Sequence, residues 1–349
     1  MFDYEFEDEL HLNGRQFKKV SADFLGADQP IQFAGARGCA FHCTYCSTAK
    51  LKQLYSGNGR FVRHISIRKY ISHVATLRSR FPRAKSFYFL DEDLFARSMD
   101  EIREFSDRFP NEVGLPFECM ASPVQVTKEK MDLFVKAGLW RLGVGVESGR
   151  DRTKKEVFKR PMTNAQVLRA AKIINRHPRV IPYYFLIIGN PCEKEQELIE
   201  TIRFLGELPA PYFLRTYNLV FFPNTLLYEM AVTEKIISGE IDCGYQLDYL
   251  AGLNTQGAEW KNRNLYLNSI LYLMAGKITP RRLGIIPHAL LEPMIRESMI
   301  RFNNRSRSLS LTFIAMKMQL MRLRSRIAEQ VMKFHGDPTA VYYLRSRRR

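Results

Sequence analysis

A chain of 349 residues with 46% hydrophobic and 26% charged side chains can bury a full core, which excludes an intrinsically disordered protein. Its longest apolar runs, such as residues 183–188, are far shorter than the ~20 residues that span a bilayer. The first ten residues are acidic, so we expect no signal peptide and a cytoplasmic protein.

The formal net charge of +17 is unevenly distributed along the chain. Residues 1–30 carry 3 basic and 7 acidic side chains, whereas residues 229–349 carry 19 basic and 10 acidic ones. A basic body implies an anionic partner. That partner is a nucleotide, a phosphate-bearing substrate, a lipid surface or RNA, and charge alone does not choose among them.

Short apolar runs alternate with amphipathic stretches in the first two thirds of the chain. Most runs are apolar on both faces, as in strands of a covered parallel sheet. The stretches between them show helix ends, such as Thr127 before residues 128–137 and Gly138 after them. This order predicts βαβ units, and we expect an α/β fold built as a partial (β/α)6 TIM-like barrel, with an open doubly wound sheet as the alternative. The expected strands are Ile31–Ala36, Lys85–Leu90, Leu115–Met120, Trp140–Val146, Pro182–Ile188 and Tyr217–Phe222.

After Tyr228 the pattern becomes helical, without a convincing strand. We therefore expect an N-terminal extension over residues 1–30, a barrel over 31–228 and a helical, basic region over 229–349. The last predicted helix carries one apolar stripe. Its members are Met316, Leu320, Leu323, Ile327, Val331 and Phe334, with Arg322, Arg326, Glu329 and Lys333 elsewhere.

Three of the six cysteines lie within eight positions. Cys39, Cys43 and Cys46 follow the first expected strand with gaps of three and two residues. Such a loop can hold three corners of an iron–sulfur cube, and the missing fourth cysteine leaves one iron open. Gly38 allows a close approach of the loop. The alternative is a structural zinc site, which needs four ligands, and His42 is poorly placed to share an ion with its neighbour Cys43.

The motif Cx3CxΦC, with Tyr45 before the last cysteine, resembles the signature of the radical S-adenosylmethionine (SAM) superfamily. The similarity runs from about Ile31 to Tyr228 and is closest to the subgroup that often carries a cobalamin-binding domain. Further stretches resemble that subgroup in the expected order. They are Phe89–Phe95, Gly143–Gly149, Lys159 with Arg160, Gly189–Glu193 and Pro223–Tyr228.

The resemblance implies an enzyme in which Cys39, Cys43 and Cys46 bind a [4Fe-4S] cluster. The open iron would chelate the amine and carboxylate of SAM. One electron would then cleave SAM and free a 5′-deoxyadenosyl radical, which takes a hydrogen atom from an unidentified substrate. A reducing protein of the flavodoxin or ferredoxin type is the implied electron donor.

Each part of SAM needs a complementary protein group, and we expect these groups at the strand ends. Asp91, Glu92 and Asp93 suit the amine. Glu147 and Ser148 suit the ribose hydroxyls or the carboxylate, and Lys159 or Arg160 suits the carboxylate. Backbone near Ile188, Gly189 and Phe222, with the Tyr45 ring, suits adenine. The alternatives are a solvated loop for the three acids and an ordinary strand-to-helix turn at Gly189.

Only 30 residues precede the first expected strand, whereas a cobalamin domain needs well over a hundred, so we expect no cobalamin. Cys192 and Asn224 stand where the subgroup often has glycine. Cys119 ends the third expected strand, either as a cavity residue or, more commonly for a free cysteine, as a buried apolar one. Cys192 and Cys243 stand alone.

The arginine-rich C-terminal region favours a lipid-like substrate or a natural-product intermediate, with peripheral membrane contact. The alternative is a stripe that packs on the barrel. A second hypothesis is an RNA-modifying enzyme, although no RNA-binding module is recognisable. A third is a non-catalytic, metal-stabilised nucleic-acid-binding protein.

Overall fold

The computed structural model describes residues 10–13, 16–19, 30–238, 264–306, 308–317, 319, 320 and 323. No helix within these ranges is both long and apolar enough to cross a bilayer. Cys243 and the expected stripe residues Ile327, Val331 and Phe334 lie outside the described ranges.

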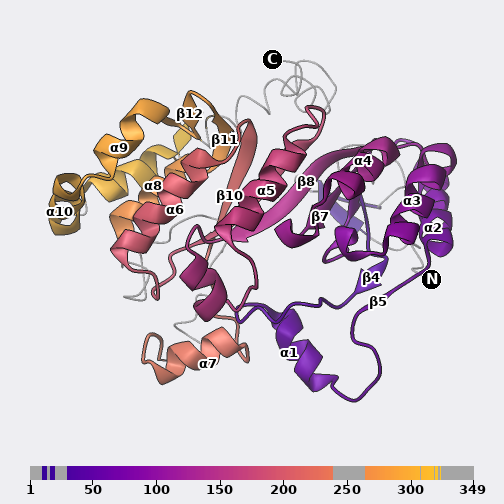
Figure 1. Ribbon diagram of the computed structural model, residues 1–349, viewed down its shortest axis with the longest axis horizontal. Helices are drawn as coiled ribbons and strands as arrows, with labels where there is room; N and C mark the ends of the chain where they lie inside the picture. The colour runs from indigo at the N-terminus through magenta and orange to yellow at the C-terminus, as the bar shows by residue number, and fades with distance from the viewer. Residues whose placement is uncertain are drawn as a thin grey trace.

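Six parallel strands form most of one sheet, from its edge strand β3 (Ile31–Phe33) to β10 (Tyr212–Asn218) (Figure 1). Their spatial order follows the chain order, and each lies beside the preceding one, as in consecutive βαβ units. The described strands do not close into a barrel, as expected of a partial (β/α)6 barrel. The six are β3 (Ile31–Phe33), β6 (Phe87–Phe89), β7 (Phe117–Ala121), β8 (Leu139–Glu147), β9 (Ile181–Ile188) and β10 (Tyr212–Asn218).

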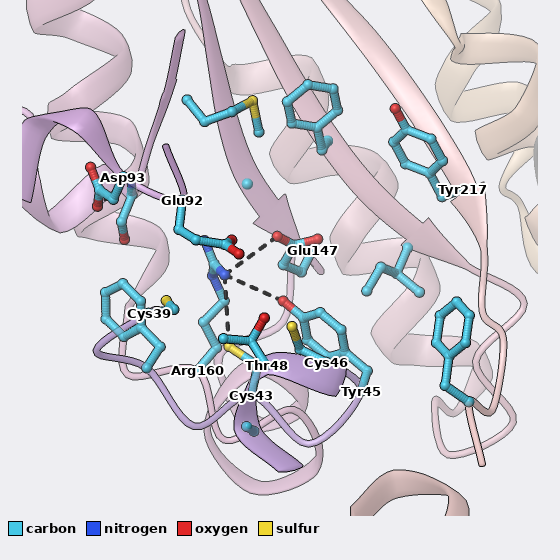
Figure 2. Close-up of a pocket in the computed structure, with 18 of the residues that line it drawn as sticks. Cys39, Cys43, Tyr45, Cys46, Thr48, Glu92, Asp93, Glu147, Arg160 and Tyr217 are labelled. Atoms are coloured by element: carbon cyan, nitrogen blue, oxygen red, sulfur yellow. Dashed lines mark hydrogen bonds and ion pairs between the residues drawn. The ribbon is translucent and has the colours of Figure 1, made fainter. Parts of the chain in front are cut away.

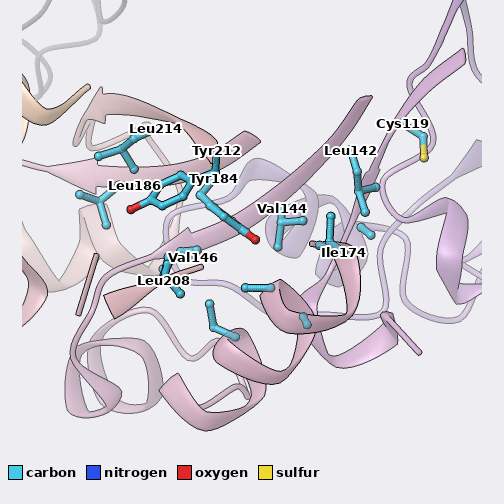
Figure 3. Close-up of a cluster of buried hydrophobic side chains, with 14 of the residues drawn as sticks. Cys119, Leu142, Val144, Val146, Ile174, Tyr184, Leu186, Leu208, Tyr212 and Leu214 are labelled. Carbon is cyan, nitrogen blue, oxygen red and sulfur yellow. The ribbon is translucent and has the colours of Figure 1, made fainter. Parts of the chain in front are cut away.

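Helices cover the convex face of this sheet, and the core lies between the two layers. Strand β9 shows the division, since its even positions are buried and its odd positions are half-buried. Figure 3 shows even-numbered side chains of β8, β9 and β10 in one buried cluster that also contains Ile174. The covering helices are α2 (Ile67–Arg80), α3 (Met99–Glu112), α4 (Lys128–Ala137), α5 (Asn164–Ile174) and α6 (Glu195–Glu207).

The local signals that mark these helices act as expected. Thr127 accepts a hydrogen bond from the Lys130 N–H, and Gly138 ends α4 with a left-handed φ of 106°. Thr163 and Gln166 form a capping box at the start of α5. Helix α6 begins at Glu195, where Lys194 and Glu197 form the capping interaction.

The sixth strand differs from the prediction over residues 217–222. Strand β10 covers Tyr212–Asn218 and pairs with β9, beginning with Phe213 opposite Tyr183. The apolar run 219–222 follows the strand, and Leu219, Val220 and Phe221 are buried there. The apolar run that predicted a strand is therefore a buried loop. Strand β10 itself carries the polar side chains of Arg215 and Tyr217 on the face that lines the cavity.

The region after Tyr228, expected to be helical without a convincing strand, contains helices and also three short strands. Strand β11 (Gly276–Thr279) pairs antiparallel with β10, and two further strands extend the sheet. These are β12 (Arg282–Leu283) and β13 (Ile286–Pro287), which are too short to give a periodic sequence signal. Helix α7 (Leu226–Thr233) runs across the expected domain boundary. The expected division into three segments stays a prediction.

The remaining C-terminal helices pack beyond this edge of the sheet (Figure 1). They are α8 (Leu265–Met274), all of whose residues are buried, α9 (Leu291–Met294) and α10 (Glu297–Ser306). Residues 308–317 are helical as well. Smaller elements are the hairpin β1 (Leu10–Asn13) with β2 (Gln16–Lys19) and the pair β4 (Ala36–Arg37) with β5 (Arg63–His64).

Candidate functional site

A cavity of about 420 Å³ lies on the concave face of the sheet, at the ends of the parallel strands. The carboxyl ends of strands are where β/α enzymes place their chemistry. The cysteine motif borders this cavity, and Figure 2 shows its three cysteines around the labelled side chains of the strand ends.

The loop that carries the cysteines connects β4 to α1 (Ser47–Leu54). Gly38 has a φ of +83°, and a Cβ there would lie 2.5 Å from the carbonyl oxygen of Phe61, so glycine is required. Thr44, inside the motif, is buried and donates its hydroxyl to the Val157 carbonyl at 2.6 Å. Its own carbonyl accepts the Leu227 N–H at 3.0 Å. The loop is thus fixed to two distant segments.

The three cysteines are free thiols, Cys43 buried and the others half-buried. Burial raises the pKa of Cys39 and of Cys43. For Cys43 the nearby Arg160 guanidinium opposes this shift and favours the thiolate, the form that binds metals. Residue His42, the candidate zinc ligand, instead faces Lys52, with Nε2 and Nζ 2.9 Å apart. In the described ranges, no three His, Cys, Asp or Glu side chains are grouped to hold one metal ion.

Arg160 lies at the centre of the site (Figure 2). Its Nη1 donates to the Tyr45 hydroxyl at 3.3 Å, lies 3.7 Å from Cys43 Sγ and forms an ion pair with Glu147 Oε1 at 3.7 Å. Burial lowers the pKa of Arg160, but the combined effect of Glu147, Tyr45 and Cys43 outweighs burial, and the net pKa is raised. Arg160 therefore stays charged, and it links the cysteine loop to the end of β8.

Glu147 ends β8 with a left-handed φ of 65°. Burial raises the pKa of its carboxyl group, and Arg160 opposes that shift. Two residues before it, Gly145 has no room for a Cβ, which would overlap the Glu147 carboxylate and crowd the Arg160 guanidinium. The glycine is therefore what allows this ion pair to lie against the strand.

The three acids after β6 have different surroundings. Glu92 is exposed and lines the cavity. Asp93 lines it too, and burial raises the pKa of its carboxyl group to about 6, although it accepts hydrogen bonds from the N–H groups of Phe95 and Ser122. Asp91 is buried and does not line the cavity.

Other predicted contacts also lie away from the cavity surface. Ser148 is buried and donates to Glu193 Oε1 at 2.6 Å. Lys159 is exposed. Ile188 is buried in the core, and the N–H of Gly189 donates to Asn268 Oδ1 at 2.8 Å. Tyr45 and Phe222 do line the cavity. The roles of all these residues toward SAM stay predictions.

Leu219 and Val220 line the cavity from the loop after β10, but most cavity residues that the sequence did not single out come from the strands. They alternate along each strand, so the period of two would have identified them once the strands were correctly bounded. Cys119, by contrast, is part of the buried core. The additional lining residues include Tyr88, Met120, Phe185, Ile187, Arg215, Tyr217, Leu219 and Val220.

A family model described as the radical SAM superfamily matches residues 35–205. This part of the chain is a radical SAM domain. The match begins just before the cysteine loop and ends within α6, so it contains the whole arrangement around Arg160. It removes the non-catalytic nucleic-acid-binding alternative, which required the ordered motifs to be chance.

Two curated relatives are methyltransferases. Cytidylyl-2-hydroxyethylphosphonate methyltransferase of Streptomyces wedmorensis is 27% identical over 203 residues, which cover 55% of this chain and 36% of the relative. An uncharacterised methyltransferase of Pyrococcus horikoshii is 27% identical over 206 residues, 58% of this chain and 42% of the relative. The chain thus spans less than half the length of either. These relatives agree with the expected enzyme and leave its subclass open.

A solved structure has the same fold over much of the chain. The radical SAM methyltransferase TsrM of Kitasatospora setae, solved with tryptophan and the SAM analogue aza-SAM, aligns with a TM-score of 0.51 at 16% identity. The alignment covers 64% of this chain and 42% of TsrM. The expectation that this chain binds no cobalamin stays a prediction.

The residues present fit the two groups that this family uses, a [4Fe-4S] cluster and SAM. Three free cysteines from one fixed loop border one cavity, and the Arg160 guanidinium favours a thiolate among them. Beside them the cavity offers carboxylates, a paired guanidinium and aromatic rings, which match the amine, carboxylate, ribose and adenine of SAM.

Proposed function

We propose that this protein is a radical SAM enzyme that uses Cys39, Cys43 and Cys46 as its cluster ligands. The observation that carries the proposal is the convergence of these cysteines on the cavity that holds the Glu147–Arg160 pair. When bound, the cluster and SAM supply reductive cleavage of the sulfonium bond and hydrogen abstraction from a substrate. Radical SAM enzymes also need a reductant, and a flavodoxin or ferredoxin is the proposed donor.

The chain's own residues bind and orient SAM in this proposal. Glu92 and Asp93 receive the methionine amine, and Glu147 receives the ribose hydroxyls. Arg160 orients the carboxylate side while it favours the Cys43 thiolate. Tyr45 and Phe222 enclose the adenine and, together with the other apolar walls, exclude water. Asp91 and Ser148 act behind the surface by holding the loops.

The curated relatives favour methyl transfer as the overall reaction, while the substrate is unidentified. A lipid-like molecule or a natural-product intermediate suits the apolar, basic C-terminal region. RNA modification is the competing hypothesis, and salt-dependent binding of RNA separates it from the first. Contact with a membrane surface in the cytoplasm is part of the proposal and is tested separately below.

The decisive experiment compares the wild type with a Cys39→Ala, Cys43→Ala, Cys46→Ala triple variant after anaerobic reconstitution. A Cys119→Ala variant serves as the control, because this cysteine lies in the core rather than on the loop. We expect about four irons per wild-type and control chain and almost none in the triple variant. Equal iron in all three contradicts the ligand assignment.

Product analysis then tests the chemistry. After reduction, the cluster-loaded wild type should convert SAM to 5′-deoxyadenosine, and the triple variant should not. S-Adenosylhomocysteine in addition would indicate methyl transfer. A cluster-loaded, reduced wild type that forms neither product overturns the proposed function.

A further inference from the structure

The floor of the cavity differs in chemistry from its mouth. The mouth carries the cysteine loop and the Glu147–Arg160 pair. The floor is formed by side chains from the middle of the strands, which also border a second, smaller cavity of about 60 Å³. The residues shared by the two cavities are Tyr88, Met120, Phe185 and Arg215.

Arg215 is held at this floor by an aromatic ring rather than by a carboxylate. Its guanidinium carbon lies 4.9 Å from the centre of the Tyr183 ring, on the neighbouring strand β9. Tyr183 in turn stacks on Phe213, with ring centres 4.9 Å apart and an interplanar angle of 12°. Such stacking orients a guanidinium without using its N–H donors.

The charges on the floor do not balance. A second guanidinium, that of Arg141, lies 5.2 Å from the Tyr183 ring centre, but it forms an ion pair with Glu118. Arg215 has no carboxylate partner within the residues that the structure describes, and its side chain is exposed to the cavity. One positive charge therefore remains uncompensated on this floor.

The positive charges of Arg141 and Arg215 both affect the pKa of the neighbouring Tyr88. Burial raises the pKa of the Tyr88 phenol, and Arg141 and Arg215 oppose that shift. Arg160 at the mouth is not an equivalent free group, because Glu147, Tyr45 and Cys43 already surround it. Of the two described arginines that line the cavity, Arg215 is therefore the one whose N–H groups can bind a ligand.

We infer that Arg215, with Tyr88, Tyr183 and Phe185, forms a subsite for an oxyanion carried by the substrate. A phosphate, phosphonate or carboxylate would receive a bidentate pair of hydrogen bonds from the guanidinium. The surrounding rings favour a flat or apolar skeleton next to that group. This inference rests on the proposed function, since it places the substrate on the floor and SAM at the mouth.

Calorimetric titration of the full chain tests the subsite. The probes are phenyl phosphate, phenylacetate and the neutral 2-phenylethanol. Substitution Arg215→Gln should weaken oxyanion binding by about tenfold or more, as loss of a charged hydrogen-bonding partner does, without changing 2-phenylethanol binding. Arg215→Lys should recover part of the affinity. Whichever anion binds the wild type more tightly identifies the oxyanion class.

A matched control is Arg169→Gln, because Arg169 is an exposed arginine on helix α5, on the other face of the sheet. It should bind all probes like the wild type, and circular dichroism should show that each variant is folded. Equal oxyanion affinity in wild type and Arg215→Gln overturns the subsite. So does the absence of wild-type binding up to roughly 10 mM, which is weaker than a free energy of about −3 kcal/mol.

A second arm separates this subsite from the SAM carboxylate. With saturating S-adenosylhomocysteine, the probes should bind with unchanged affinity, because both sites are occupied together. Displacement of the probes would assign Arg215 to SAM and overturn the inference. These titrations need no electron donor, so they are independent of the activity assay. If the chain loads iron and cleaves SAM but does not bind the oxyanion probes, the subsite alone is rejected. If the chain binds the probes but never cleaves SAM, the proposed function is rejected.

Discussion

Asp91 Oδ1 accepts the backbone N–H of Gly35 at 2.7 Å and thereby joins the end of β6 to the turn that leads to Cys39. The same oxygen accepts the N–H of Ala36 at 3.1 Å, and Oδ2 lies 3.6 Å from Arg97 Nη2. The sequence pointed to Asp91 as a contact of the SAM amine. In the structure, Asp91 is buried and binds the backbone of the turn that precedes the cysteine loop.

Substitution Asp91→Asn should destabilise the fold by about 2 kcal/mol, because it removes the buried charge that accepts two backbone N–H groups and leaves Arg97 with Glu101 as its one carboxylate partner among the described residues. Urea unfolding measures this loss, and iron retained after reconstitution should fall with it. Asp100→Asn is the control, since Asp100 also pairs with an arginine but its side chain is 94% exposed. An Asp91→Asn chain as stable as this control contradicts the role.

Glu193 should make stability depend on pH. It is buried, and burial raises the pKa of its carboxyl group from 4.5 to about 7, although Ser148 donates a hydrogen bond to it. Between these pH values the folded chain binds more protons at this group than the unfolded chain. The unfolding free energy should therefore fall as pH rises from about 4.5 to about 7, by at most on the order of 3 kcal/mol.

Urea unfolding at pH 5 and pH 8 measures that slope. Glu193→Gln should remove this contribution, because an amide cannot titrate. Glu197→Gln on the same helix is the contrast: Arg152 lowers the pKa of Glu197, so its stabilising charge is present at both pH values. If the Glu193→Gln chain retains the wild-type decline between pH 5 and pH 8, the assignment is wrong.

The Arg160–Glu147 pair should behave as a coupled unit. Arg160→Gln leaves the buried Glu147 carboxylate without its cation and should cost about 3 kcal/mol of unfolding free energy. Adding Glu147→Gln should restore at least half of that loss. A double-mutant cycle from urea unfolding measures the coupling, and additive losses would show that the two side chains act independently.

Much of the fold follows from local patterns in the sequence. Residues 128–137 form α4 with the expected ends because Thr127 and Gly138 supply the cap geometry at its two termini. Five of the six parallel strands match their predicted runs closely, and the sixth overlaps its run at residues 217 and 218 alone, since strands covered by helices need apolar side chains. The sixth was displaced because β10 carries the polar residues Arg215, Thr216 and Asn218, whereas the more apolar Leu219–Phe221 run is a buried loop.

Site residues could be predicted where they lie close together in the sequence, but not where packing brings them together. Cys39, Cys43 and Cys46 lie in one loop, so their spacing is visible in the sequence. The stacking of Arg215 on Tyr183 joins residues 32 positions apart, which only the pairing of β9 with β10 brings together. The same holds for Thr44, whose partners Val157 and Leu227 come from distant segments.

The described part of the terminal helix has two unlike faces, and this gives the prediction of membrane contact a specific test. Ile314 is buried in the main core and Lys317 reaches backbone carbonyls of residues 273 and 275, so one face packs on the protein. Three residues of the expected apolar stripe are nevertheless exposed: Met316 at 39%, Leu320 at 37% and Leu323 at 54%. Arg322, Arg326 and Lys333 lie outside the described side chains.

Full-length wild type should therefore co-sediment with vesicles that contain phosphatidylserine and less with pure phosphatidylcholine, because basic residues contribute about 1 kcal/mol each near an anionic surface. The double substitution Leu320→Gln, Leu323→Gln should weaken that binding about tenfold, since each leucine loses apolar burial. Leu51→Gln with Leu54→Gln is the control, because these leucines are at least as exposed but lie on α1. If the terminal-helix variant sediments like the control, or the wild type ignores the anionic lipid at moderate salt, this helix is a structural cap and the lipid hypothesis fails.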